Sequence, residues 1–149
     1  MPDVKARLRI YEQTISITAP REEIWRVLSD VAEWPVWLPT VSTVQPLDGD
    51  SLRIGARYVV RQPNLRPTTW VVTDLEEDVR FVWVALSPGL RMTAAHTIEE
   101  FQSGIFTVVL RFTFAGLLGG LTGWLFRSTT ESYLAQEAAS LKQRVAASR

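Results

Sequence analysis

The sequence contains no cysteine and a single histidine, His96, among its 149 residues. Without thiols the chain can form no disulfide, no zinc–thiolate site and no cysteine nucleophile. A metal site would have to draw most of its ligands from carboxylates, and no clustered set of carboxylates appears along the chain. We therefore expect neither a metal ion nor a cofactor.

A net charge of one sign is also missing, because 16 basic residues balance 16 acidic ones. A neutral chain has no overall field to attract nucleic acid or an anionic membrane, so we expect no nucleic-acid partner. The most apolar stretch, residues 112–126, contains four glycines and is shorter than the ~20 residues that span a bilayer, so no stable membrane insertion is expected. Residues 1–7 lack the apolar run of a signal peptide, and we expect a soluble cytoplasmic protein.

Aromatic and apolar residues, by contrast, are plentiful. An apolar fraction of 46% with 21% charged residues is typical of a folded protein, and 149 residues can bury the core of one domain. Six tryptophans, six phenylalanines and three tyrosines would dominate the energetics of that core. For any one of them, core packing is the simplest interpretation.

The first 40 residues predict a strand, a helix and a short elbow. Residues 6–18 alternate as a strand, but the parity of the apolar positions changes after Ile10, which predicts a one-residue bulge near Glu12. Thr18 or Ala19 is expected to cap a helix that has Pro20 at its first position. The buried stripe of this helix is predicted to consist of Ile24, Val27, Leu28 and Val31.

The elbow follows in residues 34–39, with the sequence Trp34-Pro35-Val36-Trp37-Leu38-Pro39. A residue before proline is disfavoured in helical geometry, so any helix between the two prolines should be about one turn long.

From residue 41 to residue 114 the pattern is one of strands joined by turns. The expected strands are residues 41–47, 57–62, 68–75, 81–86, 92–101 and 105–114. Short, hairpin-like connections favour an antiparallel meander, and the N-terminal strand brings the total to seven.

After Gly116 the hydrophobic period changes. Residues 117–126 are apolar but rich in glycine, which leaves a weak helix and a loop equally open. A strong helix is predicted from Arg127 to about Ala147. Its inner stripe is predicted to contain Trp124, Glu131, Leu134, Ala138, Leu141 and Val145. No other segment is long enough to cover the apolar face of the sheet.

This α+β order of elements resembles the START-like or SRPBCC superfamily with its helix-grip fold, and most of all its polyketide cyclase/dehydrase-like branch. The resemblance rests on His96 and on residues 17–30, 34–39, 81–83, 88–89, 104–116 and 134–142. It implies that residues 1–149 form one domain, in which a seven-stranded antiparallel sheet curls around the C-terminal helix. Two short helices lie between strands 1 and 2 of that fold, and a cavity separates sheet and helix.

Strand parity nominates the side chains that would line such a cavity. The lining residues predicted in this way are Tyr58, Val60, Trp70, Val72, Phe81, Trp83, Met92, Ala94, His96, Phe106, Val108, Leu110, Phe112 and Phe114. Trp34, Trp37 and Trp124 are expected to close its mouth. An apolar lining with a few polar tips is typical of sites for hydrophobic small molecules. The alternative is a core that side chains fill completely.

His96 is the candidate for chemistry, because imidazole is the side chain that titrates nearest neutral pH. It shares parity with Met92 and Ala94, which would point it inward. It could hydrogen-bond a ligand carbonyl or act as a general acid/base in an aldol-type cyclisation. It could equally be a structural histidine bonded to a hydroxyl or a backbone carbonyl.

Three functions fit this sequence. The first is binding of a hydrophobic lipid, polyketide or other aromatic molecule, and the second is a cyclase or dehydratase that uses the same cavity. The sequence favours binding, since His96 and Tyr58 are almost the only polar groups predicted for the cavity. The third is a quinone carrier, because residues 29–41 also resemble the coenzyme-Q-binding branch of the superfamily.

Overall fold

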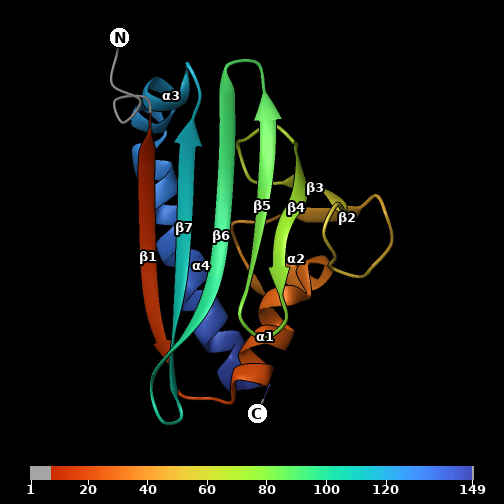
Figure 1. The fold of residues 1–149 in the computed structure, drawn as a ribbon, viewed down its shortest axis with the longest axis vertical. Helices are drawn as coiled ribbons and strands as arrows, with labels where there is room; N and C mark the ends of the chain where they lie inside the picture. The colour runs from red at the N-terminus through yellow and green to blue at the C-terminus, as the bar shows by residue number, and fades with distance from the viewer. Residues whose placement is uncertain (1–7, 149) are drawn as a thin grey trace.

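A seven-stranded antiparallel sheet with a long helix packed along one face forms most of the molecule (Figure 1). The computed structural model describes residues 8–148. The strands are β1 (Arg9–Ile17), β2 (Thr43–Pro46), β3 (Arg57–Arg61), β4 (Thr68–Glu76), β5 (Arg80–Ser87), β6 (Leu90–Gln102) and β7 (Ile105–Ala115). They lie in the order β1-β7-β6-β5-β4-β3-β2. The seven strands and their antiparallel arrangement were predicted from the sequence and are confirmed.

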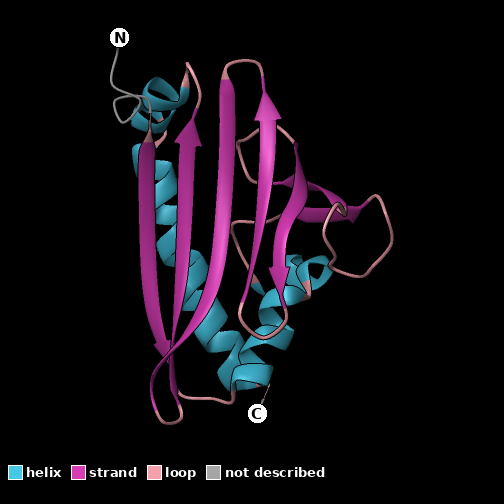
Figure 2. Cartoon of the chain, in the orientation of Figure 1, coloured by secondary structure: helices cyan, strands magenta, loops and turns pink. Residues whose placement is uncertain are grey.

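Helices occur in two groups, one after β1 and one after β7 (Figure 2). The first group consists of α1 (Arg21–Ser29), the 3-10 turn η2 (Val31–Glu33) and α2 (Trp34–Trp37). The second consists of α3 (Gly119–Leu125) and α4 (Arg127–Ala147). The predicted bounds of the long helix are confirmed, and the glycine-rich segment, which the sequence left open, forms a helix.

The predicted bulge in the first strand is wrong. The register between β1 and β7 runs without a shift from Arg9 opposite Phe114 to Ile17 opposite Phe106. Ile10 simply faces outward from this edge strand and is 56% exposed. A single exposed apolar side chain is common on protein surfaces, so an unbroken hydrogen-bond ladder prevails. Residues 6 and 7 of the predicted strand lie outside the described residues.

The first helix begins one residue later than predicted. Pro20 is the N-cap, with φ −57° and ψ 141°, and the helix starts at Arg21. The Pro20 carbonyl accepts hydrogen bonds from the backbone N–H groups of Glu23 and Ile24, at 3.0 and 3.3 Å. Proline is accommodated at this position because a cap contributes its carbonyl rather than its N–H.

The elbow has the predicted length of one turn, but its two prolines act differently. Trp34 is helical, with φ −52° and ψ −39°, although Pro35 follows it. Leu38 is extended before Pro39, with φ −108° and ψ 106°. The expectation for residues before proline therefore holds at the end of α2 and fails at its start, where η2 leads directly into α2.

The inner stripe of α4 differs from the predicted one at its start. The buried residues of α4 are Thr130, Leu134, Ala138, Leu141 and Val145. Glu131 and Trp124 are exposed instead. Glu131 lies about 100° around the helix from Thr130, and Trp124 belongs to a separate helix, because the chain breaks helical phase at Phe126.

Gly116 directly follows β7. Its φ of +93° lies in the region that favours glycine, and a Cβ added there would lie 2.7 Å from the Gly89 carbonyl oxygen. We expect Gly116→Ala to lower the free energy of unfolding by about 2–3 kcal/mol, through backbone strain and displacement of the turn at Gly89. Gly104→Ala is the control, since Gly104 has φ +78° but no atom within 4 Å of the new Cβ. Its loss should be about 1 kcal/mol. Equal losses in urea titrations would contradict the steric argument.

Candidate functional site

His96 lies at the centre of a buried group of aromatic rings. It stands opposite Phe81 in the β5–β6 register, and the two rings stack with centroids 4.1 Å apart at 14°. Trp34 and Trp83 approach the imidazole at 5.6 and 6.0 Å. The side chain of His96 is only 5% exposed. The prediction from strand parity that His96 points inward is therefore confirmed.

Trp34 reaches this group from the elbow. Its indole Nε1 donates a hydrogen bond to the Leu28 carbonyl oxygen at 3.1 Å, and its ring packs on Trp83 at 5.3 Å. Trp34 is 3% exposed, so it lies within the core rather than at an opening. Trp37 contacts Trp34 at 6.3 Å and is partly buried.

The other predicted lining residues share this core. Tyr58, Val60, Trp70, Val72, Phe81, Trp83, Ala94, Phe106, Val108, Leu110 and Phe114 are buried, and Met92 and Phe112 are partly buried. Trp70 stacks on Trp83 at 5.6 Å and meets Phe112 edge-on at 5.8 Å. Such contacts show that aromatic side chains occupy the interior at these positions. Contact of any of these residues with a ligand stays a prediction.

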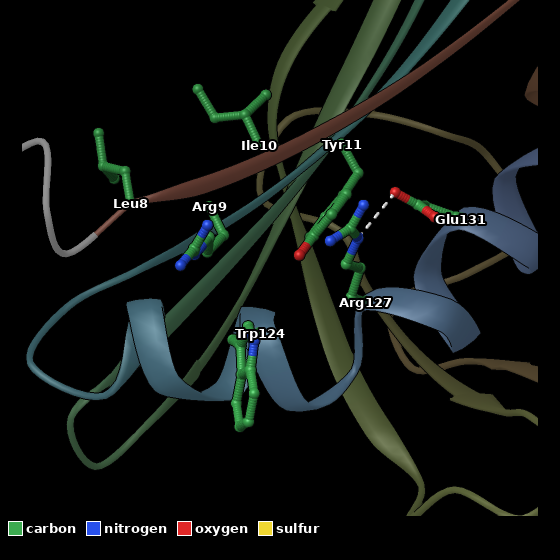
Figure 3. A pocket seen from close by; sticks show the side chains of 7 residues that line it. All are labelled: Leu8, Arg9, Ile10, Tyr11, Trp124, Arg127 and Glu131. Carbon is green, nitrogen blue, oxygen red and sulfur yellow. Dashed lines mark hydrogen bonds and ion pairs between the residues drawn. The ribbon is translucent and has the colours of Figure 1, made fainter.

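Trp124, the third expected mouth residue, lies elsewhere. It is 59% exposed on α3, a helix that packs near β7 and β1 (Figure 1). It borders a surface hollow of about 710 Å³. The side chains around that hollow, shown in Figure 3, are Leu8, Arg9, Ile10, Tyr11, Trp124, Arg127 and Glu131. The structure therefore does not bring the three mouth tryptophans together.

Glu137 is the polar partner of His96 that sequence reasoning missed. Its Oε1 lies 3.5 Å from His96 Nε2, and its side chain is 15% exposed. The same Oε1 is buried and accepts no hydrogen bond from the described residues. A signal was present, because Glu137 follows Leu134 by three residues and precedes Leu141 by four, on the flank of the buried stripe of α4.

The hydrogen bonds of His96 indicate where a proton belongs. Its Nδ1 lies 3.3 Å from the Phe81 carbonyl oxygen, which can only accept, so Nδ1 carries a hydrogen. In neutral imidazole Nε2 then presents a lone pair toward Glu137. Their contact is attractive only when a proton lies between Nε2 and Oε1.

Tyr58 contributes little polarity at this place. Its hydroxyl donates to the Ser51 carbonyl oxygen at 3.2 Å, in the loop before β3. Burial raises the pKa of Tyr58, which keeps the hydroxyl protonated at neutral pH. The polar groups that face each other between sheet and α4 are therefore His96 and Glu137.

Residues 8–148 offer neither a metal site nor a membrane-spanning helix. In that range no three His, Cys, Asp or Glu side chains gather closely enough to hold a metal ion. None of the helices there combines the length and the hydropathy needed to cross a bilayer.

Comparison with known structures supports the fold. The aromatase/cyclase Zhui from Streptomyces sp. R1128 superposes with a TM-score of 0.71 at 18% identity, over 93% of each chain. Norcoclaurine synthase from Thalictrum flavum, solved with dopamine and hydroxybenzaldehyde, gives 0.75 at 12% identity over 95% of this chain and 88% of its own. The di-domain aromatase/cyclase BexL gives 0.66 at 21% identity, and the match covers 92% of this chain and 46% of BexL. A comparison with curated proteins found no match.

These likenesses establish the curled sheet around a long C-terminal helix as the helix-grip fold expected from the resemblance. The family model described as polyketide cyclase/dehydrase and lipid transport matches residues 9–146. Together with the fold, this match supports a role in ligand binding or cyclisation. The chain therefore belongs to the polyketide cyclase/dehydrase and lipid transport family, within the START-like or SRPBCC superfamily.

Proposed function

We propose that this protein binds a hydrophobic aromatic molecule between the curled sheet and α4, with a polar group of that molecule at His96 and Glu137. The observation that carries the proposal is the buried Glu137 Oε1, which lies 3.5 Å from His96 Nε2 and accepts no hydrogen bond from the described residues. A buried carboxylate oxygen without a donor is costly, so a ligand hydroxyl at this oxygen would be strongly favoured.

The surroundings suit an aromatic ligand. Trp34, Phe81 and Trp83 present ring faces and edges around His96. A planar ligand can replace such ring contacts with its own, in stacked or edge-on geometry. Entry requires side chains to move, and the partly buried Met92, with its flexible thioether, is the adaptable member of the lining.

The test is a titration with 2,6-dihydroxyanthraquinone, whose hydroxyls have no internal acceptor, followed by quenching of tryptophan fluorescence and by native mass spectrometry. We expect saturable binding, and Glu137→Gln should weaken it about tenfold, because a hydrogen bond to a charged acceptor is lost. Unsubstituted anthraquinone has no hydroxyl to donate, so its affinity should change less than about twofold. Glu22→Gln, which removes an exposed carboxylate on α1, should leave both affinities unchanged.

A result against the proposal is also well defined. If lipids, quinones and aromatic polyketides all left the fluorescence and the native mass spectrum unchanged, the interior would be a filled core without a ligand. Tight binding of a long-chain quinone with no response to Glu137→Gln would support the quinone-carrier alternative instead.

A second function, catalysis of an aldol-type cyclisation, is favoured by the His96–Glu137 pair itself. The Phe81 carbonyl orients the imidazole through Nδ1–H, and the Glu137 carboxylate beside Nε2 would stabilise the imidazolium that forms when Nε2 takes a proton. In this reaction His96 Nε2 would take a proton from a methylene between two carbonyls, and the carbanion would attack a ketone of the same chain. The resulting alkoxide would receive that proton back, which balances the step.

A further inference from the structure

The apolar residues of the α3 segment face outward. Six large hydrophobic side chains in residues 117–126 are each at least 40% exposed, namely Leu117, Leu118, Leu121, Trp124, Leu125 and Phe126. Contiguous exposed apolar surface of this kind marks an interaction site more often than chance. We call these six side chains the α3 patch.

The chain fixes α3 in this orientation through its glycines. Gly119 and Gly123 are the buried residues of the helix, which reverses the usual pattern of large side chains inside. The Tyr11 hydroxyl donates to the Gly123 carbonyl oxygen at 2.6 Å. The stem of Arg9 packs so closely on Gly123 that a Cβ there would lie 2.5 Å from Arg9 Cβ. Close packing through glycine therefore turns the α3 patch outward.

Positive charge borders the α3 patch. Arg9 and Arg127 line the hollow beside Trp124 (Figure 3), and the Arg127 side chain is 66% exposed. Arg91, also exposed, stands opposite Ala115 in the register, next to the turn that leads into α3. Glu131 offsets part of this charge, at 3.5 Å from Arg127. The border of the α3 patch thus holds three arginines, Arg9, Arg91 and Arg127, against the carboxylate of Glu131, so these four side chains carry a net positive charge although the whole chain is neutral.

We propose that the α3 patch docks on the surface of an anionic lipid bilayer. Leucine, phenylalanine and tryptophan side chains on a short helix enter the boundary between headgroups and acyl chains, and arginines at its border meet lipid phosphates. A second copy of the chain is a poorer occupant, because pairing two α3 patches would bring their arginines together. The helix lies on the membrane in this arrangement and does not cross it.

The test is flotation of the full-length protein with vesicles of phosphatidylcholine that contain about one third phosphatidylglycerol. We expect binding to these vesicles and at least tenfold weaker partitioning to pure phosphatidylcholine. The triple variant Leu121→Ser, Trp124→Ser, Leu125→Ser should lose about tenfold or more in partitioning, because its apolar contacts are removed. These side chains are exposed, so its thermal unfolding should match that of the wild type.

Matched control variants distinguish binding through the α3 patch from nonspecific adsorption to vesicles. Val36→Ser with Phe101→Ser removes two exposed apolar side chains, of which Phe101 lies at the end of β6 far from α3 (Figure 1), and should leave partitioning unchanged. Arg9→Gln with Arg127→Gln keeps the stem atoms that touch Gly123 and should weaken binding to anionic vesicles about tenfold. Arg26→Gln with Arg61→Gln, at exposed positions of α1 and β3, is the charge control.

Two outcomes would overturn the proposal. One is equal partitioning of the wild type and the triple serine variant. The other is a dimer in sedimentation equilibrium that the triple variant converts to a monomer, with no binding of the wild type to anionic vesicles. Neither result depends on whether the interior site holds a ligand, so the two proposals fail independently.

Discussion

Replacing Trp34 with alanine is expected to lower the free energy of unfolding by about 3–5 kcal/mol, which is the range for large aromatic residues removed from a core. Trp34 is 3% exposed and contacts the rings of Phe81, Trp83 and His96. Its truncation would also leave the Leu28 carbonyl without the indole donor. Since small domains have only 5–15 kcal/mol of stability, a large part of the total would be lost.

Trp124→Ala is the matched control for this prediction. The same atoms are removed, but from a side chain that is 59% exposed on α3, so the loss should stay within about 0.5 kcal/mol. Guanidinium titrations of both variants measure the difference. Similar losses for the two would show that Trp34 does not carry the core contacts assigned to it.

If His96 is the general base of a cyclase, His96→Ala should slow cyclisation of a synthetic poly-β-ketone thioester by about 100-fold or more. Glu137→Gln should have a smaller effect, about tenfold, because the Phe81 carbonyl still orients the imidazole but the amide carries no charge to stabilise the imidazolium. Initial rates of ring formation, measured by absorbance, give both values. Glu22→Gln, on the exposed face of α1, should leave the rate unchanged.

An unchanged rate in His96→Ala would remove this residue from any mechanism. A folding defect is distinguished by a second variant, His96→Gln, which keeps a side-chain amide near the Phe81 carbonyl. If His96→Gln unfolds at the wild-type temperature and still lacks activity, the loss belongs to proton transfer. If it regains full activity, a structural histidine is the correct interpretation.

Local periodicity predicted the elements well, because each depends on neighbours in sequence. The strand at residues 105–114 and the helix at residues 127–147 appear within one residue of their expected bounds. Inward parity was likewise correct at Tyr58, Phe81 and Val108, all of which are completely buried. The errors at Glu12 and Pro20 concern single positions, where ladder hydrogen bonds and capping geometry outweigh the pattern.

The sequence by itself therefore determined the order of elements, the side of the sheet that is buried and the inward direction of His96. Only the tertiary structure decided which side chain of α4 meets that histidine, since residues 96 and 137 come together through the packing of α4 against the sheet. Tertiary packing alone likewise decided that Trp34 lies in the core and Trp124 on the surface. Both are tryptophans beside apolar residues, and what separates them is that α3 presents glycines to the sheet, whereas α2 presents an indole.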